Sequence, residues 1–254
     1  MKEYFIKDDG IDIHAKLEMP DNAKDGGKYP LVIVVHGYTG HMEEPHIIGA
    51  AEAARAAGCA SLCVEMYGHG KSGGLFRNHT LYKWVSNMLT VVEHARSLDF
   101  VTDLYLCGHS QGGLLVMLIA GMCPDRIKAI LPLSPAWMIP EAARAGEMLG
   151  EKVDPVNIPD EFIQDGEHLL SGNYIRVAQT IHVEDEIARY DGPVLIVHGD
   201  EDESVPYEYG VKAAKMYKNA KLVTIAGDDH CYDHHLDLVT GAITDFLKEM
   251  TSDE

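Results

Sequence analysis

Apolar and polar positions along the chain follow two alternating patterns, one typical of buried strands and one typical of helices. Continuous apolar runs indicate parallel strands that are covered on both faces, and they occur at 31–35, 60–66, 104–107, 127–133, 193–198 and 221–225. Segments with helical patterns lie between them, at 45–57, 81–98, 114–122, 208–217 and 236–250. This alternation predicts an α/β fold with a mostly parallel, doubly wound sheet.

Two stretches depart from the alternation. Residues 4–7 and 11–19 alternate apolar and polar positions around an Asp-Asp-Gly turn, which predicts a β-hairpin. Roughly sixty residues separate the strands at 127–133 and 193–198, whereas an ordinary crossover needs only one helix. We therefore expect a single domain over residues 1–254 with an inserted segment as its only candidate subdomain.

A serine lies in the turn between an apolar strand and an apolar helix. Residues 108–112, Gly-His-Ser-Gln-Gly, match the G-x-S-x-G nucleophile elbow. Gly108 and Gly112 leave room where a Cβ would clash in so sharp a turn. The helix that follows supplies free N–H groups and a partial positive charge. We interpret Ser110 as a nucleophile; a glycine-rich turn that contains a serine without a catalytic role is the alternative.

A serine hydroxyl is a weak nucleophile until a base takes its proton and a carboxylate orients that base. In α/β-hydrolases the acid and then the histidine follow the serine along the chain. The loop after the strand at 193–198 offers four carboxylates, Asp200, Glu201, Asp202 and Glu203. The spacing G-x-x-D-x-x-V-P resembles the acid loop of serine α/β-hydrolases, which favours Asp202. A solvated acidic turn or a calcium site is the alternative, although the spacing does not match a calcium loop.

The loop at 226–235 offers the base. His230 lies between the last strand and the last helix, just after Gly-Asp-Asp, where such a histidine is expected. His234 and His235 are rivals, and a metal cluster of these histidines with Asp233 is a further alternative. Adjacent histidines on a helix would point to different faces, which weakens the metal interpretation. We expect His230 to be the base.

Two backbone N–H groups are expected to bind a developing oxyanion. One is that of Gln111, directly after the nucleophile, and the other is that of Tyr38, which follows His36-Gly37 in the loop after the strand at 31–35. The glycine-rich loop at 67–74 has the composition of a phosphate loop but lacks its spacing, so we interpret it as structural.

The amino-acid composition argues against several classes of protein. The chain carries 21 Lys and Arg against 40 Asp and Glu, a net charge of −19, which argues against binding nucleic acid or an anionic membrane. Its five cysteines include no C-x-x-C pair, so we expect reduced thiols and neither a disulfide framework nor a zinc site. The N-terminus has no apolar signal core and no run reaches transmembrane length, which predicts a cytoplasmic protein.

Seven segments together resemble the bacterial feruloyl (cinnamoyl) esterases of the α/β-hydrolase fold. They are His36-Gly-Tyr-Thr-Gly40, Tyr67-Gly-His-Gly-Lys-Ser72, Gly108-His-Ser-Gln-Gly-Gly113, Leu133-Ser-Pro135, Asn173-Tyr-Ile-Arg-Val-Ala-Gln179, His198-Gly-Asp-Glu-Asp202 and His230-Cys-Tyr232. The resemblance spans nearly the whole chain, although many relatives have Phe where Tyr38 stands. The general hydrolase motifs are shared with monoacylglycerol lipases and peptidases.

The resemblance implies a serine carboxylic-ester hydrolase that cleaves feruloyl or other hydroxycinnamoyl esters. Ser110, His230 and Asp202 would act as a catalytic triad through an acyl-enzyme, with no metal or organic cofactor. A short-chain acyl esterase, a monoacylglycerol lipase-like enzyme or a peptidase on the same fold is the alternative specificity. A binding protein that keeps the fold without catalysis is the alternative class.

In that family the insertion forms a cap over the serine, which places the cap of this chain at about 136–188. An aromatic acyl group needs an apolar slot with one or two polar groups at its far end. The candidates for the wall are Trp137, Met138, Phe162 and Tyr174, and the candidates for the phenol acceptor are Glu141 and Glu147. Ordinary packing or a solvated carboxylate is the alternative for each. The expected partner is a small aromatic ester; a homodimer fits a chain of this type, but no residue pattern requires one.

Overall fold

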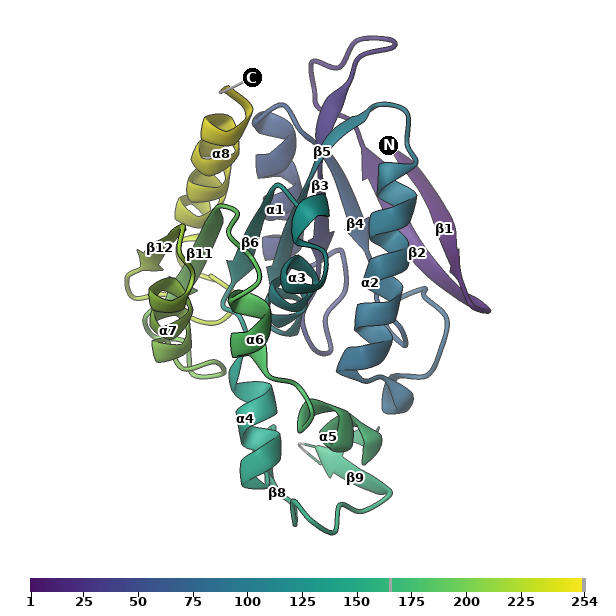
Figure 1. The fold of residues 1–254 in the computed structure, drawn as a ribbon, viewed down its shortest axis with the longest axis vertical. Helices are drawn as coiled ribbons and strands as arrows, with labels where there is room; N and C mark the ends of the chain where they lie inside the picture. Colours follow the sequence, from purple (N-terminus) through teal and green to yellow (C-terminus); the bar gives the residue numbers. More distant parts are fainter. Residues whose placement is uncertain (165, 253–254) are drawn as a thin grey trace.

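An eight-stranded, mostly parallel sheet forms the centre of the computed structural model, which describes residues 1–164 and 166–252 (Figure 1). The strand order is β1-β2-β4-β3-β5-β6-β11-β12. The strands are β1 (Lys2–Asp8), β2 (Ile11–Glu18), β3 (Tyr29–Val35), β4 (Ala60–Val64), β5 (Val101–His109), β6 (Ala129–Leu133), β11 (Val194–Gly199) and β12 (Ala220–Ile225). Within this sheet the pairings of β2 with β1 and β4 are antiparallel and the other pairings are parallel, so the predicted α/β sheet is confirmed.

Helices cover both faces of the sheet, which explains why its central strands are apolar throughout. They are α1 (Pro45–Ala56), α2 (Leu81–Arg96), α3 (Gln111–Met122), α7 (Glu208–Met216) and α8 (Leu236–Ser252), with 3-10 turns η1 (Phe76–Asn78) and η2 (Pro124–Arg126). In β3, Ile33 packs into the core that includes α2 and α3, whereas Val32 and Val34 pack into the core that includes α1 and α8. This alternation is that of a pleated strand buried on both sides.

The predicted hairpin forms the edge of the sheet. β1 and β2 pair from Lys2 opposite Leu17 to Asp8 opposite Ile11, and the turn between them has positive φ at Asp9 and Gly10. The Asp8 carboxylate accepts hydrogen bonds from the side chains of Asn87 (2.6 Å) and Thr90 (2.8 Å) on α2. The hairpin is therefore anchored to the helix that covers the sheet beside it.

Most of the inserted segment between β6 and β11 lies beyond the carboxyl ends of the parallel strands, at the bottom of Figure 1, and its last helix returns to pack against α3. Its elements are short: α4 (Met138–Ala145), β7 (Glu147–Met148), β8 (Glu151–Lys152), β9 (Glu161–Gln164), β10 (His168–Ser171), α5 (Asn173–Ala178) and α6 (Val183–Ile187). β7 pairs with β8 and β9 pairs with β10, both antiparallel. Because these helices and strands are so short, hydrophobic periodicity in the sequence does not resolve them.

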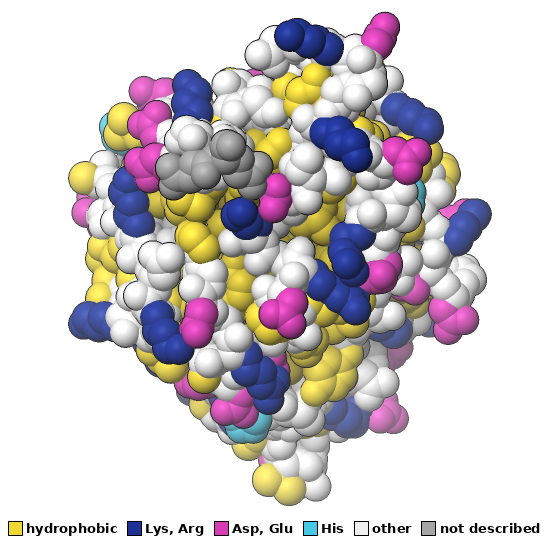
Figure 2. All heavy atoms as spheres, turned by 45° about the horizontal axis from the view of Figure 1, so that its top comes forward, with side chains coloured by type: hydrophobic (Ala, Val, Ile, Leu, Met, Phe, Trp, Pro, Cys, Tyr) yellow, Lys and Arg dark blue, Asp and Glu magenta, His cyan; other side chains and the backbone are white. Residues whose placement is uncertain are grey.

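The opposite end of the molecule carries charges of both signs. Figure 2 turns the top of Figure 1 toward the viewer, and on this face Lys and Arg side chains are interspersed with Asp and Glu. The excess of acidic residues therefore does not form one continuous field here. Among the described residues, no helix is both long enough and apolar enough to cross a bilayer.

We predict that Leu106→Ala lowers the free energy of unfolding by about 2–5 kcal/mol, because it leaves a cavity in the middle of the sheet. Leu106 is fully buried in β5, opposite Ile33 on one neighbouring strand and Ile130 on the other. Urea unfolding measures the effect. Leu75→Ala, at a side chain that is 56% exposed, is the control and should change stability by less than about 0.5 kcal/mol. Equal effects of the two substitutions would contradict the prediction.

Candidate active site

Ser110 occupies the sharp turn between β5 and α3. Its φ of 55° and ψ of −117° are unfavourable for a residue with a side chain, and such strain persists only where the surrounding structure holds it. The Ser110 N–H donates to the Leu133 carbonyl (2.9 Å), and its carbonyl accepts from Leu114 and Ala136 (both 3.0 Å). Backbone contacts to β6, to α3 and to the start of the insertion thus keep the serine in this conformation.

The glycines around Ser110 are required by the close approach of three backbone segments. A Cβ on Gly108 would overlap the carbonyl of Gly112, and a Cβ on Gly112 would overlap the carbonyl of His36. A Cβ on Gly37 would lie 3.0 Å from the Cβ of Ser110. These contacts bring the loop after β3 directly against the serine, as the nucleophile elbow requires.

Asp202 and His230 form a hydrogen-bonded pair next to this turn. The His230 Nδ1 lies 2.7 Å from Oδ2 of Asp202, so Nδ1–H donates to the carboxylate. The other oxygen, Oδ1, accepts from the backbone N–H groups of Ser204 (2.9 Å) and Val205 (2.8 Å). The structure therefore brings together the predicted acid and base, and among the four carboxylates of its loop Asp202 is the one in this pair.

His198 is a further partner of Asp202 that the sequence did not reveal. Its Nε2 lies 3.0 Å from the Val205 carbonyl and 3.2 Å from Oδ2 of Asp202, and both side chains are fully buried. Burial alone would raise the pKa of Asp202, but the hydrogen bonds from His198 and His230 outweigh it and hold the pKa well below its usual value. The only sequence feature that could have indicated this contact is the position of a histidine four residues before Asp202.

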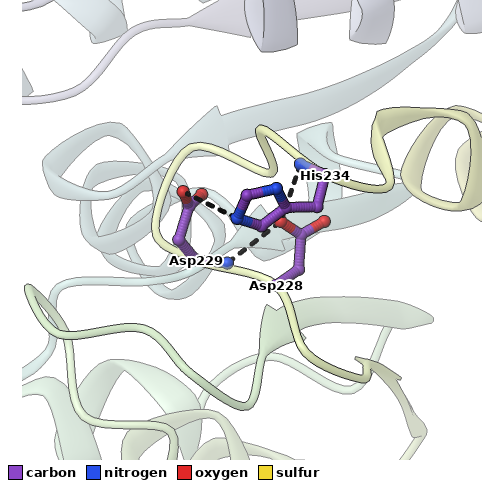
Figure 3. A group of neighbouring side chains, drawn as sticks. All are labelled: Asp228, Asp229 and His234. Atoms are coloured by element: carbon purple, nitrogen blue, oxygen red, sulfur yellow. Dashed lines mark hydrogen bonds and ion pairs between the residues drawn. The ribbon is translucent and has the colours of Figure 1, made fainter.

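The rival histidines lie away from this pair. The side chains of His234 and His235 are 62% and 44% exposed, whereas His230 faces the carboxylate. Figure 3 shows His234 with Asp228 and Asp229, a group whose potential ligand atoms all lie within 4.8 Å of one another. The buried Asp228 carboxylate accepts backbone N–H groups from Asp229, His234 and His235, at 2.9 to 3.1 Å. These bonds fold the loop that carries His230.

A cavity of about 590 Å³ opens beside Ser110 and His230, a volume that suits a small organic ligand. One side comes from the core of the fold: residues 37–40, Glu44, His109, Ser110, 203–205, His230 and Cys231. The other side comes from the inserted segment: Ala136, Met138, Ile139, Ala142, Glu147, Leu149, Gly150 and Gln164. The serine and the histidine therefore face a compartment whose far wall is mostly apolar.

The two residues predicted to supply oxyanion donors lie in the loop after β3 and directly after Ser110. Tyr38 lines the cavity, and its hydroxyl donates to Oε1 of Gln164 on β9 (3.3 Å). Gln111 is the first residue of α3, where backbone N–H groups have no partner within the helix. Its side-chain Oε1 accepts from the Tyr174 hydroxyl (2.6 Å). Both residues are thus linked to the inserted segment through their side chains.

Four residues predicted to touch a substrate, Trp137, Glu141, Phe162 and Tyr174, do not line the cavity. Trp137 and Glu141 lie one helical turn apart and face α7, whereas Met138, Ile139 and Ala142 of the same helix face the cavity. Phe162 is half-buried against the core, and Tyr174 is fully buried against Gln111. These four residues therefore pack behind the cavity wall.

Other residues of the inserted segment do line the cavity. Met138 and Glu147 were also candidates from the sequence, whereas Gln164 lies in no motif that marks it.

Buried histidines surround the site and are held neutral. Nε2 of His109 lies 2.7 Å from the His230 carbonyl and donates to it, which fixes the backbone of the predicted base. Nδ1 of His36 lies 2.7 Å from the Gly37 carbonyl, and its Nε2 accepts from the Met66 N–H (3.1 Å). Burial lowers the pKa of His36 to about 3 and that of His109 well below its usual value.

Comparisons with known proteins place the chain among the α/β-hydrolases. The family profile described as serine aminopeptidase, S33, matches residues 28–160, and that of TAP-like proteins matches residues 169–254. The structure of Est1E from Butyrivibrio proteoclasticus with ferulic acid bound has a TM-score of 0.96 and 58% identity, covering 98% of this chain and 99% of Est1E. Another structure of Est1E gives a TM-score of 0.92 and 55% identity, again over 98% of this chain.

A more distant curated relative is the mitochondrial palmitoyl-protein thioesterase ABHD10 of Pongo abelii. It is 22% identical over 193 residues, which span 74% of this chain and 62% of the relative. The structure of the corresponding mouse protein has a TM-score of 0.75 at 19% identity, which shows the common fold alone.

We predict that a fluorophosphonate labels this protein once, on Ser110, because the reagent reports a serine activated by a base. Intact-mass and peptide mass spectrometry measure the adduct. Ser110→Ala should not be labelled, and Asp202→Asn should react at least about 10³-fold more slowly because His230 loses the carboxylate that sets its tautomer. Labelling of Ser110→Ala at the wild-type rate would contradict the assignment of the nucleophile.

We also predict that stability falls as the pH is lowered from 7 to 5. Burial lowers the pKa of His36, His46 and His79 to about 3, 4 and 3, whereas an exposed imidazole titrates near 6.5. Below about pH 6.5 the unfolded chain therefore binds protons that the folded protein does not, and unfolding becomes easier until the pH nears the folded-state pKa. At pH 5 each histidine should contribute about 2 kcal/mol of destabilisation.

Urea unfolding at the two pH values tests this effect. His79→Phe removes one of these groups and should reduce the loss of stability between pH 7 and 5 by about 2 kcal/mol. A free energy of unfolding that is the same at pH 7 and 5 would show that these imidazoles are protonated in the folded state.

Proposed function

The chain belongs to the α/β-hydrolase family that the serine aminopeptidase S33 profile describes, and from this premise we propose that it is a serine esterase of feruloyl and related hydroxycinnamoyl esters. The observation that carries the proposal is the likeness to Est1E, at 58% identity over 98% of this chain, in a structure that holds ferulic acid. The pair of Asp202 and His230 beside Ser110 supplies the chemistry for cleaving an ester.

The proposed reaction begins when the Ser110 hydroxyl attacks the ester carbonyl and His230 Nε2 takes its proton. Asp202, 2.7 Å from Nδ1, holds the imidazole in the tautomer that leaves Nε2 free and stabilises the imidazolium that forms. The N–H groups of Tyr38 and Gln111 bind the oxyanion, and each such donor is typically worth about 3 kcal/mol in the transition state. His230 then protonates the leaving alcohol, and water releases the acid from the acyl-enzyme by the same steps.

The far wall of the cavity supports an aromatic acyl group. Met138, Ile139 and Leu149 are apolar and come from the inserted segment, so a flat ring can lie against them. Glu147 and Gln164 line the same side and supply polar atoms for a phenol or a methoxy group. This pattern of an apolar slot with a few polar groups is typical of a site for a small organic ligand.

Three further proposals accompany this function. Residues 136–188 act as a cap, because the inserted segment supplies one wall of the cavity. The protein works in the cytoplasm, which agrees with its five free cysteines, all of them within the described part of the chain. A homodimer stays a prediction, and sedimentation equilibrium tests it.

We predict that wild-type protein hydrolyses methyl ferulate with a higher kcat/KM than p-nitrophenyl butyrate or a monoacylglycerol. Ser110→Ala should lower kcat for methyl ferulate by at least about 10³-fold, because the nucleophile is lost. Steady-state kinetics measure both, and Ser86→Ala, at an exposed position on α2, is the matched control with full activity. Preference for the aliphatic esters would keep the nucleophile but refute the aromatic specificity.

A further inference from the structure

The helix that forms part of the cavity wall is attached to the core through its opposite face. On α4, Trp137 at its N-cap and Glu141 lie one turn apart, and on α7 Tyr209 and Lys212 lie three residues apart. The Tyr209 hydroxyl donates to Oε2 of Glu141 (2.8 Å), and its ring centre is 6.5 Å from that of Trp137. Each helix thus presents one aromatic and one charged side chain to the other.

Lys212 joins both ends of the inserted segment to α7. Its Nζ lies 2.6 Å from Glu141 on α4 and 3.2 Å from Glu184 on α6. The same ammonium lies 3.9 Å from the ring centre of Trp137, within cation–π range. Although burial opposes ionisation of both groups, their mutual hydrogen bond lowers the pKa of Glu141 and raises that of Lys212, so both stay charged near neutral pH.

This attachment connects the cavity wall to the element that carries the acid. α7 begins six residues after Asp202, and Gly210 on α7 packs so closely on His198 that a Cβ there would lie 2.6 Å from the imidazole Nδ1. His198 in turn contacts Asp202. On the other face of α4, Met138, Ile139 and Ala142 line the cavity. Lys212 therefore bridges the proposed acyl wall and the support of the acid without touching the cavity itself.

We propose that Lys212 is a positioning residue that sets the distance between the α4 wall and the reacting serine, and so determines how well a bulky aromatic acyl group is held. This inference rests on the proposed esterase function for its kinetic consequence. Each contact is partly exposed, since Lys212 and Glu141 keep 37% and 35% of their side-chain surface, and such ion pairs are weak one by one. Because these contacts converge on one ammonium, a single substitution of Lys212 removes its contacts to both α4 and α6.

The test is the kinetics of Lys212→Met, which keeps the length of the side chain and removes its charge. For methyl ferulate, KM should rise about tenfold while kcat stays within about twofold, since the ring loses its wall but the triad is intact. For p-nitrophenyl acetate, whose acyl group is too short to reach the wall, kcat/KM should stay within about twofold. Lys212→Arg keeps the cation and its contact with Trp137, and it should restore KM for methyl ferulate.

Lys215→Met is the matched control, because Lys215 lies on the same helix and is exposed. A KM for methyl ferulate in Lys212→Met that equals that of the control would overturn the proposal. An equal loss on both substrates would also overturn it, because it would show damage to the fold or to the triad.

Tryptophan fluorescence tests the contact between Lys212 and Trp137 independently of ester hydrolysis. The chain has two tryptophans, Trp84 and Trp137, and only Trp137 lies under Lys212. Lys212→Met should shift the emission to longer wavelength and increase quenching by acrylamide, whereas Lys215→Met should not. If wild-type protein hydrolyses p-nitrophenyl acetate but not methyl ferulate, the proposed function fails, and this spectrum still decides whether Lys212 holds α4. An unchanged spectrum in Lys212→Met would refute the role of Lys212.

Discussion

The strained backbone of Ser110 is the constraint on which the site depends. A residue with positive φ between a strand and a helix is stable only if the neighbouring backbone is close enough to hold it. Here β6, the loop after β3 and the start of the insertion all approach the turn, and Gly108, Gly112 and Gly37 are the positions where that approach leaves no room for a side chain. The glycines, the serine and the loop after β3 are therefore parts of one packing arrangement.

The contact between Asp202 and His230, the proposed acid and base, depends on a second arrangement, which is built from loops rather than from strands. Asp202 is buried, yet its carboxylate has contacts to two backbone N–H groups and two imidazoles, which satisfy it as an anion. The loop of His230 is shaped by the buried carboxylate of Asp228 and by the bond from His109 to the His230 carbonyl. Residues outside the proposed triad thus hold Asp202 and His230 in contact.

The inserted segment supplies one wall of the cavity, whereas Ser110, Asp202 and His230 come from the core of the fold. Most of the inserted segment lies at the carboxyl ends of the strands, where Ser110 and His230 also lie, and its short elements need the core against which they pack. The side chains that it sends into the cavity are mostly apolar, and those that it sends toward α7 carry charge or an aromatic ring. One face of α4 is thus available to a ligand because the opposite face is attached to the core.

The sequence by itself determined the sheet and the sharp turn at Ser110, and it predicted that Asp202 and His230 would lie together, because each depends on local pattern. Buried strands are continuous apolar runs, an elbow needs glycines at fixed spacing, and loops that follow parallel strands meet at one edge. It could not place the residues that line the cavity: Trp137 and Glu141 resemble wall residues in composition, but only the rotation of α4 decides that they face α7 while Met138 and Ala142 face the cavity. His198 and Gln164 were missed for a similar reason, since their roles come from contacts with residues on other loops and strands. Local patterns specify elements and turns, whereas the orientation of short elements is decided by packing between segments that are far apart in the chain.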